Sequence, residues 1–372
     1  MAEFSPGHLQ GATVAVTGAS GNVGTALLRR LTAPGSGVAE VRGLARRTPP
    51  EVAPYDGVRW FSADLGDPES ETVLERFVDG ADVVVHLAWA LQPGREPDLL
   101  RRINVDGTYR VARAASAAGV AQFLHMSSIG TYAAGAVGRK VTEDWPITGV
   151  PSSQYSRDKS EAERVVRQVL AHRTPTVLSV ARPTLVLQPE AGSEIGRYFL
   201  GPLVFGAARH VPGAVARLLP LPLPSMAVSF VHADDVADAL ERIVDRRVPG
   251  PFNIAAEPVL DAGGIADALG ARRIPVPAIA LRVPLQAAFL AHLVPTEPGW
   301  LDLGTSLPAM DTSRARTLLG WEPAHRSDDV LRQFVAALGA GTGGPGALLR
   351  PASGPELDPA GDPANAPGPR AG

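Results

Sequence analysis

The stretch Thr13-Val-Ala-Val-Thr-Gly-Ala-Ser-Gly-Asn-Val-Gly24 decides the fold of this chain. Its first four residues form a short apolar run that predicts a buried strand, and apolar residues recur at helical spacing over 26–31. Between these segments, Gly18, Gly21 and Gly24 suit a tight turn, close approach of a ligand and close helix-on-strand packing, in that order. Free N–H groups at the start of a helix bind phosphate. The stretch therefore predicts a strand, a turn and a helix that seat the pyrophosphate of a dinucleotide.

Strand-like and helix-like segments alternate after this unit. The strands are expected at 41–45, 58–62, 82–87, 122–127 and 176–181, and the helices at 68–78, 99–118 and 155–172. Alternation at this spacing predicts an α/β fold of the Rossmann type, with a doubly wound parallel sheet and right-handed crossovers. Such sheets bind ligands beyond the carboxyl ends of their strands, so we expect the glycine turn and the residues that end the later strands to share one cleft.

The pattern changes after Arg182, where prolines and glycines become dense and the predicted elements become short. We therefore expect a dinucleotide-binding core over 1–182, with returns to it near 228–256. A smaller C-terminal, substrate-capping subdomain is expected mainly over 183–340. The tail over 341–372 is rich in Pro, Gly and Ala and is expected to be disordered.

The composition excludes several classes of function. The 372 residues carry a net charge of −3 and no long basic run, so nucleic acid is not an expected partner. The absence of cysteine excludes disulfides and thiolate catalysis and fits a reducing cytoplasm, the expected location. The most apolar segments, 217–230 and 278–294, are interrupted by Pro, Arg or His, so no membrane span is expected. No His, Asp or Glu cluster has the spacing of metal ligands, so no metal is expected.

The stretch Tyr155-Ser-Arg-Asp-Lys159 is the second informative feature, because it places a phenol and an ammonium four residues apart on one helix face. A phenol has a pKa of about 10 and is a poor base at neutral pH. A neighbouring ammonium and the positive ring of a nicotinamide would favour the phenolate. Ser127 and Ser128 end the preceding strand, where a hydroxyl could polarise a substrate oxygen. The pattern predicts hydride transfer at a carbinol or carbonyl carbon of a small-molecule substrate, with Tyr155 moving the proton.

Further motifs follow in a recognisable order. They are His86-Leu87-Ala88, Asn104-Val-Asp-Gly-Thr108, Phe230-Val-His-Ala-Asp-Asp-Val-Ala237 and Leu319-Gly-Trp-Glu-Pro323. With the glycine turn, spaced Gly-x-x-Gly-x-x-Gly, and the Tyr155–Lys159 pair, they resemble the short-chain dehydrogenase/reductase superfamily. The late motifs are similar to those of its extended branch, the NAD-dependent epimerase/dehydratase family. The resemblance covers residues 11–338 and implies the same Rossmann-type fold.

The resemblance implies roles for individual residues. The active serine of the family lies four residues before a tyrosine, which here is Tyr132. This relation selects Ser128 and leaves Ser127 as a small residue that ends a buried strand. The expected catalytic residues are therefore Ser128, Tyr155 and Lys159. A homodimer formed through the helices expected at 99–118 and 155–172 is also implied.

The resemblance further implies which residues hold the cofactor. Lys159 would bind the nicotinamide ribose, and Asp64 and Leu65 would lie against the adenine. Asn104, His232 and Asp235 would have structural roles. The full set of expected cofactor contacts is Gly18, Ser20, Gly21, Asn22, Val23, Gly24, Arg46, Asp64, Leu65, Leu87, Ala88, Lys159 and Arg182.

The end of the second strand bears on the choice of cofactor. An acidic residue there would hold the ribose hydroxyls of NAD, whereas arginine suits the phosphate of NADP. This strand ends Leu44-Ala-Arg-Arg47, without a carboxylate. The two arginines are either solvated loop charges, or Arg46, helped by Arg47, binds the 2′-phosphate through bidentate hydrogen bonds. We expect NADP to be preferred, with NAD as the alternative.

The substrate is the least determined part of the expectation. Nucleotide-sugar enzymes of the extended branch usually carry an Asn and a Tyr-Gly pair after the sixth strand and an Arg before a later strand. This chain has Pro183-Thr-Leu-Val-Leu-Gln188 and Ala227-Val-Ser229 there. Apolar segments at 198–200, 203–205, 218–221 and 285–293 would form either subdomain core, a dimer face or a pocket for an apolar alcohol or ketone. The alternatives are a nucleotide-sugar epimerase and a non-catalytic NAD(P)-binding regulatory protein.

Overall fold

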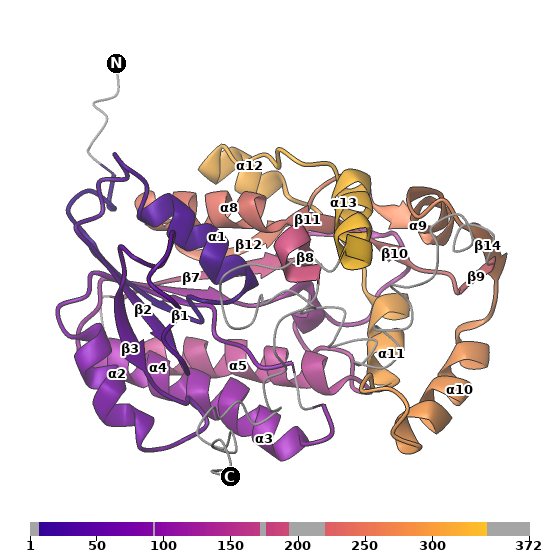
Figure 1. Cartoon of the computed structure of the whole chain (residues 1–372), viewed down its shortest axis with the longest axis horizontal. Helices are drawn as coiled ribbons and strands as arrows, with labels where there is room; N and C mark the ends of the chain where they lie inside the picture. The colour runs from indigo at the N-terminus through magenta and orange to yellow at the C-terminus, as the bar shows by residue number, and fades with distance from the viewer. Residues whose placement is uncertain (1–6, 92–93, 172–175, 193–219, 341–372) are drawn as a thin grey trace, which may run out of the picture.

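The computed structural model describes residues 7–91, 94–171, 176–192 and 220–340. Its centre is a seven-stranded sheet whose strands are all parallel, in the order β12-β7-β5-β4-β1-β2-β3 (Figure 1). The order reverses between β1 and β4, which is where doubly wound sheets bind ligands. The predicted Rossmann-type fold is confirmed. The strands are β1 (Thr13–Thr17), β2 (Glu40–Ala45), β3 (Arg59–Ser62), β4 (Val83–His86), β5 (Gln122–Met126), β7 (Val177–Pro183) and β12 (Gly250–Ile254).

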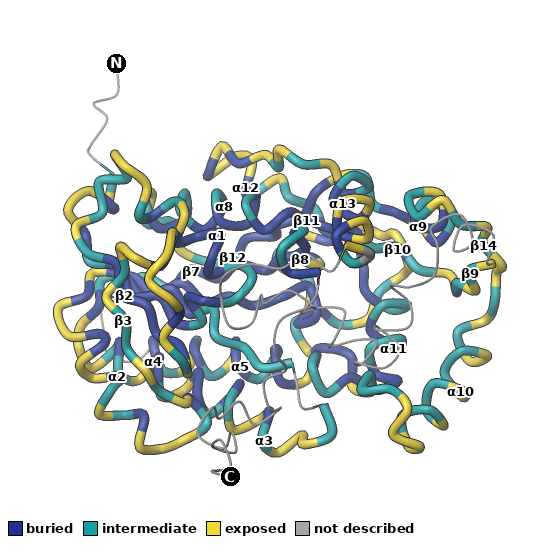
Figure 2. Tube along the Cα trace, in the orientation of Figure 1, coloured by how far each residue is buried: buried dark blue, intermediate teal, exposed yellow. Residues whose placement is uncertain are grey.

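Helices cover both faces of this sheet. One face is covered by α1 (Asn22–Leu31) and α8 (Ala233–Asp245), and the other by α2 (Ser70–Val78), α4 (Gly107–Ala117) and α5 (Gln154–Ala171) (Figure 1). Because both faces are covered, the central strands are mainly apolar, and all four residues of β4 are buried. Figure 2 shows the buried strands between helices whose outer sides are exposed.

The helix expected over 99–118 is divided into α3 (Pro97–Arg101), a π-helical turn (Arg102–Asp106) and α4. Turns of this kind inside helices occur frequently at functional sites. Here the turn carries Asn104, whose Oδ1 accepts the backbone N–H of Ala90 (2.7 Å) and whose Nδ2 donates to the Ala90 carbonyl (2.8 Å). These two bonds fix the backbone that follows β4.

The region near 228–256 begins with two short strands, β10 (Ala227–Val228) and β11 (Phe230–His232), which pair with different strands. After α8 the chain returns to the main sheet, where β12 pairs with β7. At the right of Figure 1, α11 (Gly299–Ser306) packs against α5, and α13 (Ser327–Ala340) packs against β11. The remaining elements are β6 (Lys140–Val141), β8 (Leu185–Leu187), β9 (Pro220–Leu223), β13 (Leu260–Asp261), α9 (Ala262–Ala268), β14 (Arg272–Pro275), α10 (Ala278–Leu290), β15 (Ala309–Met310), α12 (Ser313–Leu319) and the 3₁₀ turns Ile129–Thr131 and Pro189–Ala191.

Some of the expected segments cannot be compared with the structure. The apolar segments 198–200 and 203–205, residues 218–219 and the tail 341–372 lie outside the described residues. The segment 285–293 falls on and just after α10, a helix without a buried residue. Within the described ranges, none of the helices has the length and apolar character that crossing a bilayer requires.

Candidate active site

The glycine turn joins β1 to α1 at the carboxyl edge of the sheet. Gly18 has a φ of 67°, and a Cβ at this residue would lie 2.7 Å from the backbone nitrogen of Ala88. Only glycine therefore fits between the ends of β1 and β4. Gly21 is the N-cap of α1, with no side chain bonded to the helix start and no acidic residue in the first turn. The free N–H groups of this first turn suit an anionic phosphate.

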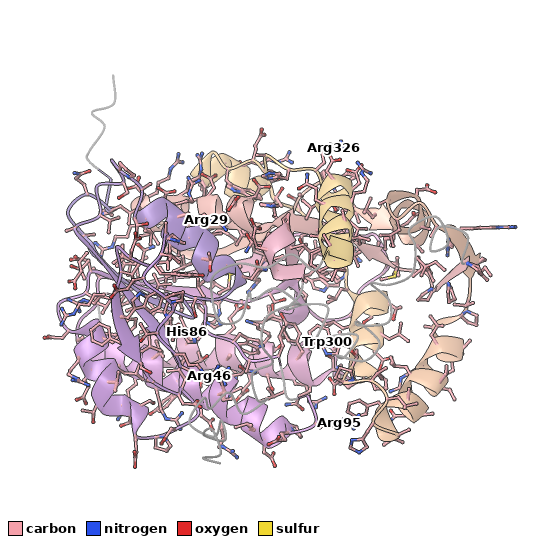
Figure 3. All side chains as sticks on the ribbon, viewed as in Figure 1. Arg29, Arg46, His86, Arg95, Trp300 and Arg326 are labelled. Carbon is pink, nitrogen blue, oxygen red and sulfur yellow. The ribbon has the colours of Figure 1, made fainter. Side chains whose placement is uncertain are left out.

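The ends of β1 and β4 are bonded together beside this turn. The backbone N–H of Leu87 donates to the Thr17 carbonyl (3.1 Å), and that of Ala88 donates to Thr17 Oγ1 (3.3 Å). His86 lies in the sheet behind them (Figure 3), between the hydroxyls of Thr17 (2.7 Å) and Thr108 (2.9 Å). Burial lowers the pKa of His86 to about 3, so it is a neutral packing residue.

The residues expected at the adenosine end follow β2 and β3. Arg46 is exposed directly after β2, and its guanidinium forms no hydrogen bond or ion pair within the described part of the chain. Asp64 follows β3 and its Oδ1 accepts the N–H of Gly66 (2.8 Å). Leu65 is buried next to the start of α4. All three lie at the edge that carries the glycine turn.

Lys159 reaches the end of β5 from the first turns of α5. Its Nζ donates to the Met126 carbonyl (3.0 Å) and lies 3.6 Å from the centre of the Trp89 ring, a cation–π contact. The residue is only 4% exposed. Burial lowers the pKa of Lys159 to about 7, and the Glu163 carboxylate opposes this effect.

Tyr155 begins the same face of α5. Its ring packs on Gly130, where a Cβ would lie 2.8 Å from Tyr155 Cε1. Burial raises the pKa of Tyr155 to about 12, although hydrogen bonding with Ser128 opposes the shift. From the sequence we expected the Lys159 ammonium to lower this pKa. In the structure, desolvation of the Tyr155 phenol has the larger effect and raises its pKa.

The two serines at the end of β5 differ in their contacts. Ser128 is buried and its Oγ accepts the N–H of Gly130 (3.0 Å), on the side that faces Tyr155. The Ser127 hydroxyl donates instead to Glu163 Oε2 (2.6 Å), away from Tyr155. The structure thus brings Ser128, Tyr155 and Lys159 together and gives Ser127 a different partner.

Two tryptophans beside Tyr155 were not expected from the sequence. The Trp300 ring lies 4.7 Å from the Tyr155 ring, centre to centre, and the Trp89 ring meets it edge-on at 6.0 Å. Trp300 comes from α11 (Figure 3), and Trp89 directly follows Ala88. Trp89 Nε1 is buried without a hydrogen-bond partner among the described residues. Trp89 could have been predicted at the site, because it follows the end of a strand. Nothing in the sequence near Trp300 indicates that it lies beside Tyr155.

Arg182 is not placed for the cofactor contact we expected. Its side chain is 2% exposed, and its Nη2 and Nε donate to Glu163 (2.5 and 3.1 Å). Its Nη1 donates to the hydroxyl of Tyr132 (3.0 Å) and to the carbonyl of Glu143 (2.9 Å). Every nitrogen of the guanidinium is thus used inside the protein, because Glu163 on α5 faces the end of β7. We correct its role to a structural one.

No group of three potential ligands in the described residues could hold a metal ion. Two cavities formed by the described residues lie away from the carboxyl edge. One is at the amino ends of β4 and β5, next to Asp82 and Gln122, and the other lies near Asp245 of α8. The candidate site is instead carried by contacts at the carboxyl edge, which join the glycine turn, residues 87–89 and the Ser128–Tyr155–Lys159 set.

Comparison with known proteins agrees with this geometry. The model of the NAD dependent epimerase/dehydratase family matches residues 14–255, more than half of the chain. The chain belongs to this family. Its named relatives include a dehydrogenase and an epimerase.

Individual relatives have different names. The dTDP-6-deoxy-L-talose 4-dehydrogenase (NAD(P)(+)) of Kitasatospora kifunensis is 31% identical over 337 residues, 89% of this chain and 96% of the relative. A UDP-glucose 4-epimerase of Mycolicibacterium smegmatis is 27% identical, with 83% of this chain and 92% of the relative covered. An uncharacterized protein of Mycobacterium tuberculosis is 30% identical over 87% of this chain, but the chain spans only 30% of that relative.

Solved structures share the fold. A short-chain dehydrogenase/reductase superfamily protein from Agrobacterium tumefaciens, solved with bound NAD, has a TM-score of 0.61 and 24% identity, covering 88% of this chain and 96% of that chain. MoeE5 in complex with UDP-glucose and NAD has a TM-score of 0.62 and 21% identity, covering 88% and 98%. At these identities the likeness shows the fold alone.

Proposed function

We propose that this protein is an NAD(P)-dependent oxidoreductase that acts on a fairly apolar alcohol or ketone, with Tyr155 as the acid/base. The observation that carries the proposal is the setting of Tyr155. Its ring contacts the rings of both Trp89 and Trp300, and its hydroxyl is paired with Ser128. Flat apolar faces of this kind suit a flat or ring-shaped apolar substrate.

The residues present fit a dinucleotide cofactor. The start of α1 is uncapped and free of acidic residues, and Gly18 leaves no side chain between the ends of β1 and β4. We propose that the glycine turn would hold the pyrophosphate and that Lys159 would hold the nicotinamide ribose. A bound nicotinamide supplies or accepts the hydride. Arg46 is exposed after β2 and has no partner among the described residues, which supports a preference for NADP through its 2′-phosphate.

The protein's own residues would handle the proton. A phenol with a pKa of about 12 is protonated at neutral pH, so Tyr155 is suited to donate a proton to a carbonyl oxygen that becomes an alkoxide. The Ser128 hydroxyl would orient that oxygen. The buried Lys159 ammonium would stabilise the phenolate left on Tyr155. The same residues would serve alcohol oxidation in the reverse direction, with the phenolate of Tyr155 accepting the proton.

A second candidate, a nucleotide-sugar dehydrogenase or epimerase, is favoured by the names of two relatives. The sequence argues against it, because residues 183–188 lack the Asn and the Tyr-Gly pair, and residues 227–229 lack the Arg, that such enzymes usually carry. A third candidate is cofactor binding without chemistry. The geometry of the Ser128–Tyr155–Lys159 set argues against that reading.

A substrate panel tests the proposal. The purified chain would be given NADPH or NADH with cyclic and aromatic ketones, with UDP-glucose and with a dTDP-sugar, and cofactor oxidation would be followed by absorbance. We expect kcat/KM for the best ketone to exceed that for the sugar nucleotides by about tenfold or more. Turnover of sugar nucleotides alone would establish the second candidate. Cofactor binding without turnover of any compound would establish the third.

A further inference from the structure

We propose that Glu163 is a positioning residue for the reaction: with Ser127 and Arg182 it forms a buried clamp that fixes the catalytic face of α5 along the end of β5. This inference rests on the proposed function, because the clamp serves the Ser128–Tyr155–Lys159 set. The three residues of the clamp come from three elements, since Ser127 follows β5, Glu163 lies on α5 and Arg182 lies on β7.

One face of α5 contacts the last residue of β5 and the two residues that follow it. Tyr155, Lys159 and Glu163 are four residues apart and lie on one helix face. Tyr155 contacts Ser128, Lys159 Nζ donates to the Met126 carbonyl (3.0 Å) and Glu163 Oε2 accepts from Ser127 (2.6 Å). Three successive turns of the helix are thus bonded to three consecutive residues, 126–128. The bond between Glu163 and Ser127 fixes the position of α5 along the strand, and with it the positions of Tyr155 and Lys159.

Arg182 makes this bond rigid. The Glu163 side chain is fully buried, and Arg182 grips it with two nitrogens (2.5 and 3.1 Å). Tyr132 then links Arg182 to β12, because its hydroxyl donates to Asn253 Oδ1 (2.6 Å). Burial raises the pKa of Glu163, but the hydrogen bonds and charge of Arg182 outweigh burial and hold it at about 2. The carboxylate is therefore charged throughout the neutral range.

The clamp also places a negative charge one helical turn from Lys159. The other titratable groups that face Lys159 are His86 on β4, His125 on β5 and Tyr155 on α5. Burial holds the pKa of both histidines far below neutral, so they carry no charge there. Glu163 is thus the charge that favours the ammonium form of Lys159.

The chain offers a direct readout, because Lys140 and Lys159 are its only lysines. Lysine labelled with carbon-13 at Cε would give two NMR signals, with the exposed Lys140 as the internal reference. The variant Glu163→Gln leaves Arg182 buried and unpaired, which can prevent folding. The double variant Glu163→Gln/Arg182→Met removes both charges, so that no unpaired charge remains buried. Glu161→Gln, the same change on the exposed side of α5, is the matched control.

We expect Lys159 in the double variant to titrate lower than in the wild type, by less than about one pH unit, because the Arg182 cation is removed together with the Glu163 carboxylate. We expect kcat/KM with a ketone substrate to fall about tenfold, with kcat affected more than KM, while the melting temperature stays close to wild type. Glu161→Gln should change none of these values. Unchanged titration and kcat/KM in a folded double variant would overturn the proposal. The titration needs no substrate, so it gives its answer even if the proposed function fails.

Discussion

The charge of Lys159 gives a prediction that can be developed quantitatively. The side chain is 4% exposed, and burial lowers its pKa from 10.5 to about 7. At one pKa unit per 1.36 kcal/mol, this shift corresponds to about 5 kcal/mol of differential interaction between the two protonation states. The bond to the Met126 carbonyl and the contact with Trp89 reduce the cost of the charged form without abolishing it.

The sign of the effect on stability follows from the direction of the shift. Between about pH 7 and about pH 10 the unfolded chain holds the Lys159 proton and the folded protein does not, so this group makes folding more favourable as pH rises through that window. Tyr132 and Tyr155 act oppositely above about pH 10, because burial raises both pKa values to about 12. The stability contributed by these two neutral phenols is lost as pH rises towards 12.

The assay is a pH titration of the wild-type protein labelled at lysine Cε. We expect the Lys159 signal to move with a midpoint of about 7. A Lys159 signal with its midpoint at the ordinary lysine value of about 10.4 would refute the reasoning, since it would show that Lys159 is not desolvated.

Three further predictions concern the cofactor and substrate sides of the site. Gly18→Ala should weaken cofactor binding about tenfold more than Gly119→Ala, measured by fluorescence titration, because both have positive φ but only Gly18 abuts Ala88. Arg46→Ala should raise the Kd for NADPH about tenfold and leave that for NADH unchanged; an equal effect on both would remove Arg46 as the phosphate ligand. Trp300→Ala should lower kcat/KM for the best ketone about tenfold, whereas Trp300→Phe should keep most of it. Equal activity of both variants would show that the aromatic ring at residue 300 does not contribute to substrate binding.

The parts of the fold that depend on local pattern could be predicted from the sequence. The glycine turn, the strand–helix alternation and the four-residue spacing of Tyr155 and Lys159 are properties of neighbouring residues, and the structure places them at one edge of the sheet. The choice of Ser128 over Ser127 came from a family resemblance. The structure supplies its physical counterpart, because Ser127 is bonded to Glu163.

The parts that depend on distant contacts could not be predicted. Arg182 ends a strand at the ligand-binding edge, but the direction of its side chain is set by Glu163, which lies 19 residues earlier on another element. Trp300 reaches Tyr155 because Gly299 lets α11 approach the backbone of Ser152, where a Cβ would lie 2.6 Å from the carbonyl oxygen. No local pattern marks such a contact. The raised pKa of Tyr155 has the same origin, since it depends on the rings that surround it.

The most direct test of the account is the variant Tyr155→Phe, which removes one hydroxyl and keeps the ring between Trp89 and Trp300. Its Kd for the cofactor and its kcat on the best ketone would be measured beside those of the wild type. The account predicts an unchanged Kd and a loss of kcat of about a hundredfold or more, the contribution of a positioned proton donor. Turnover close to wild type in this variant would contradict the central claim that Tyr155 moves the proton.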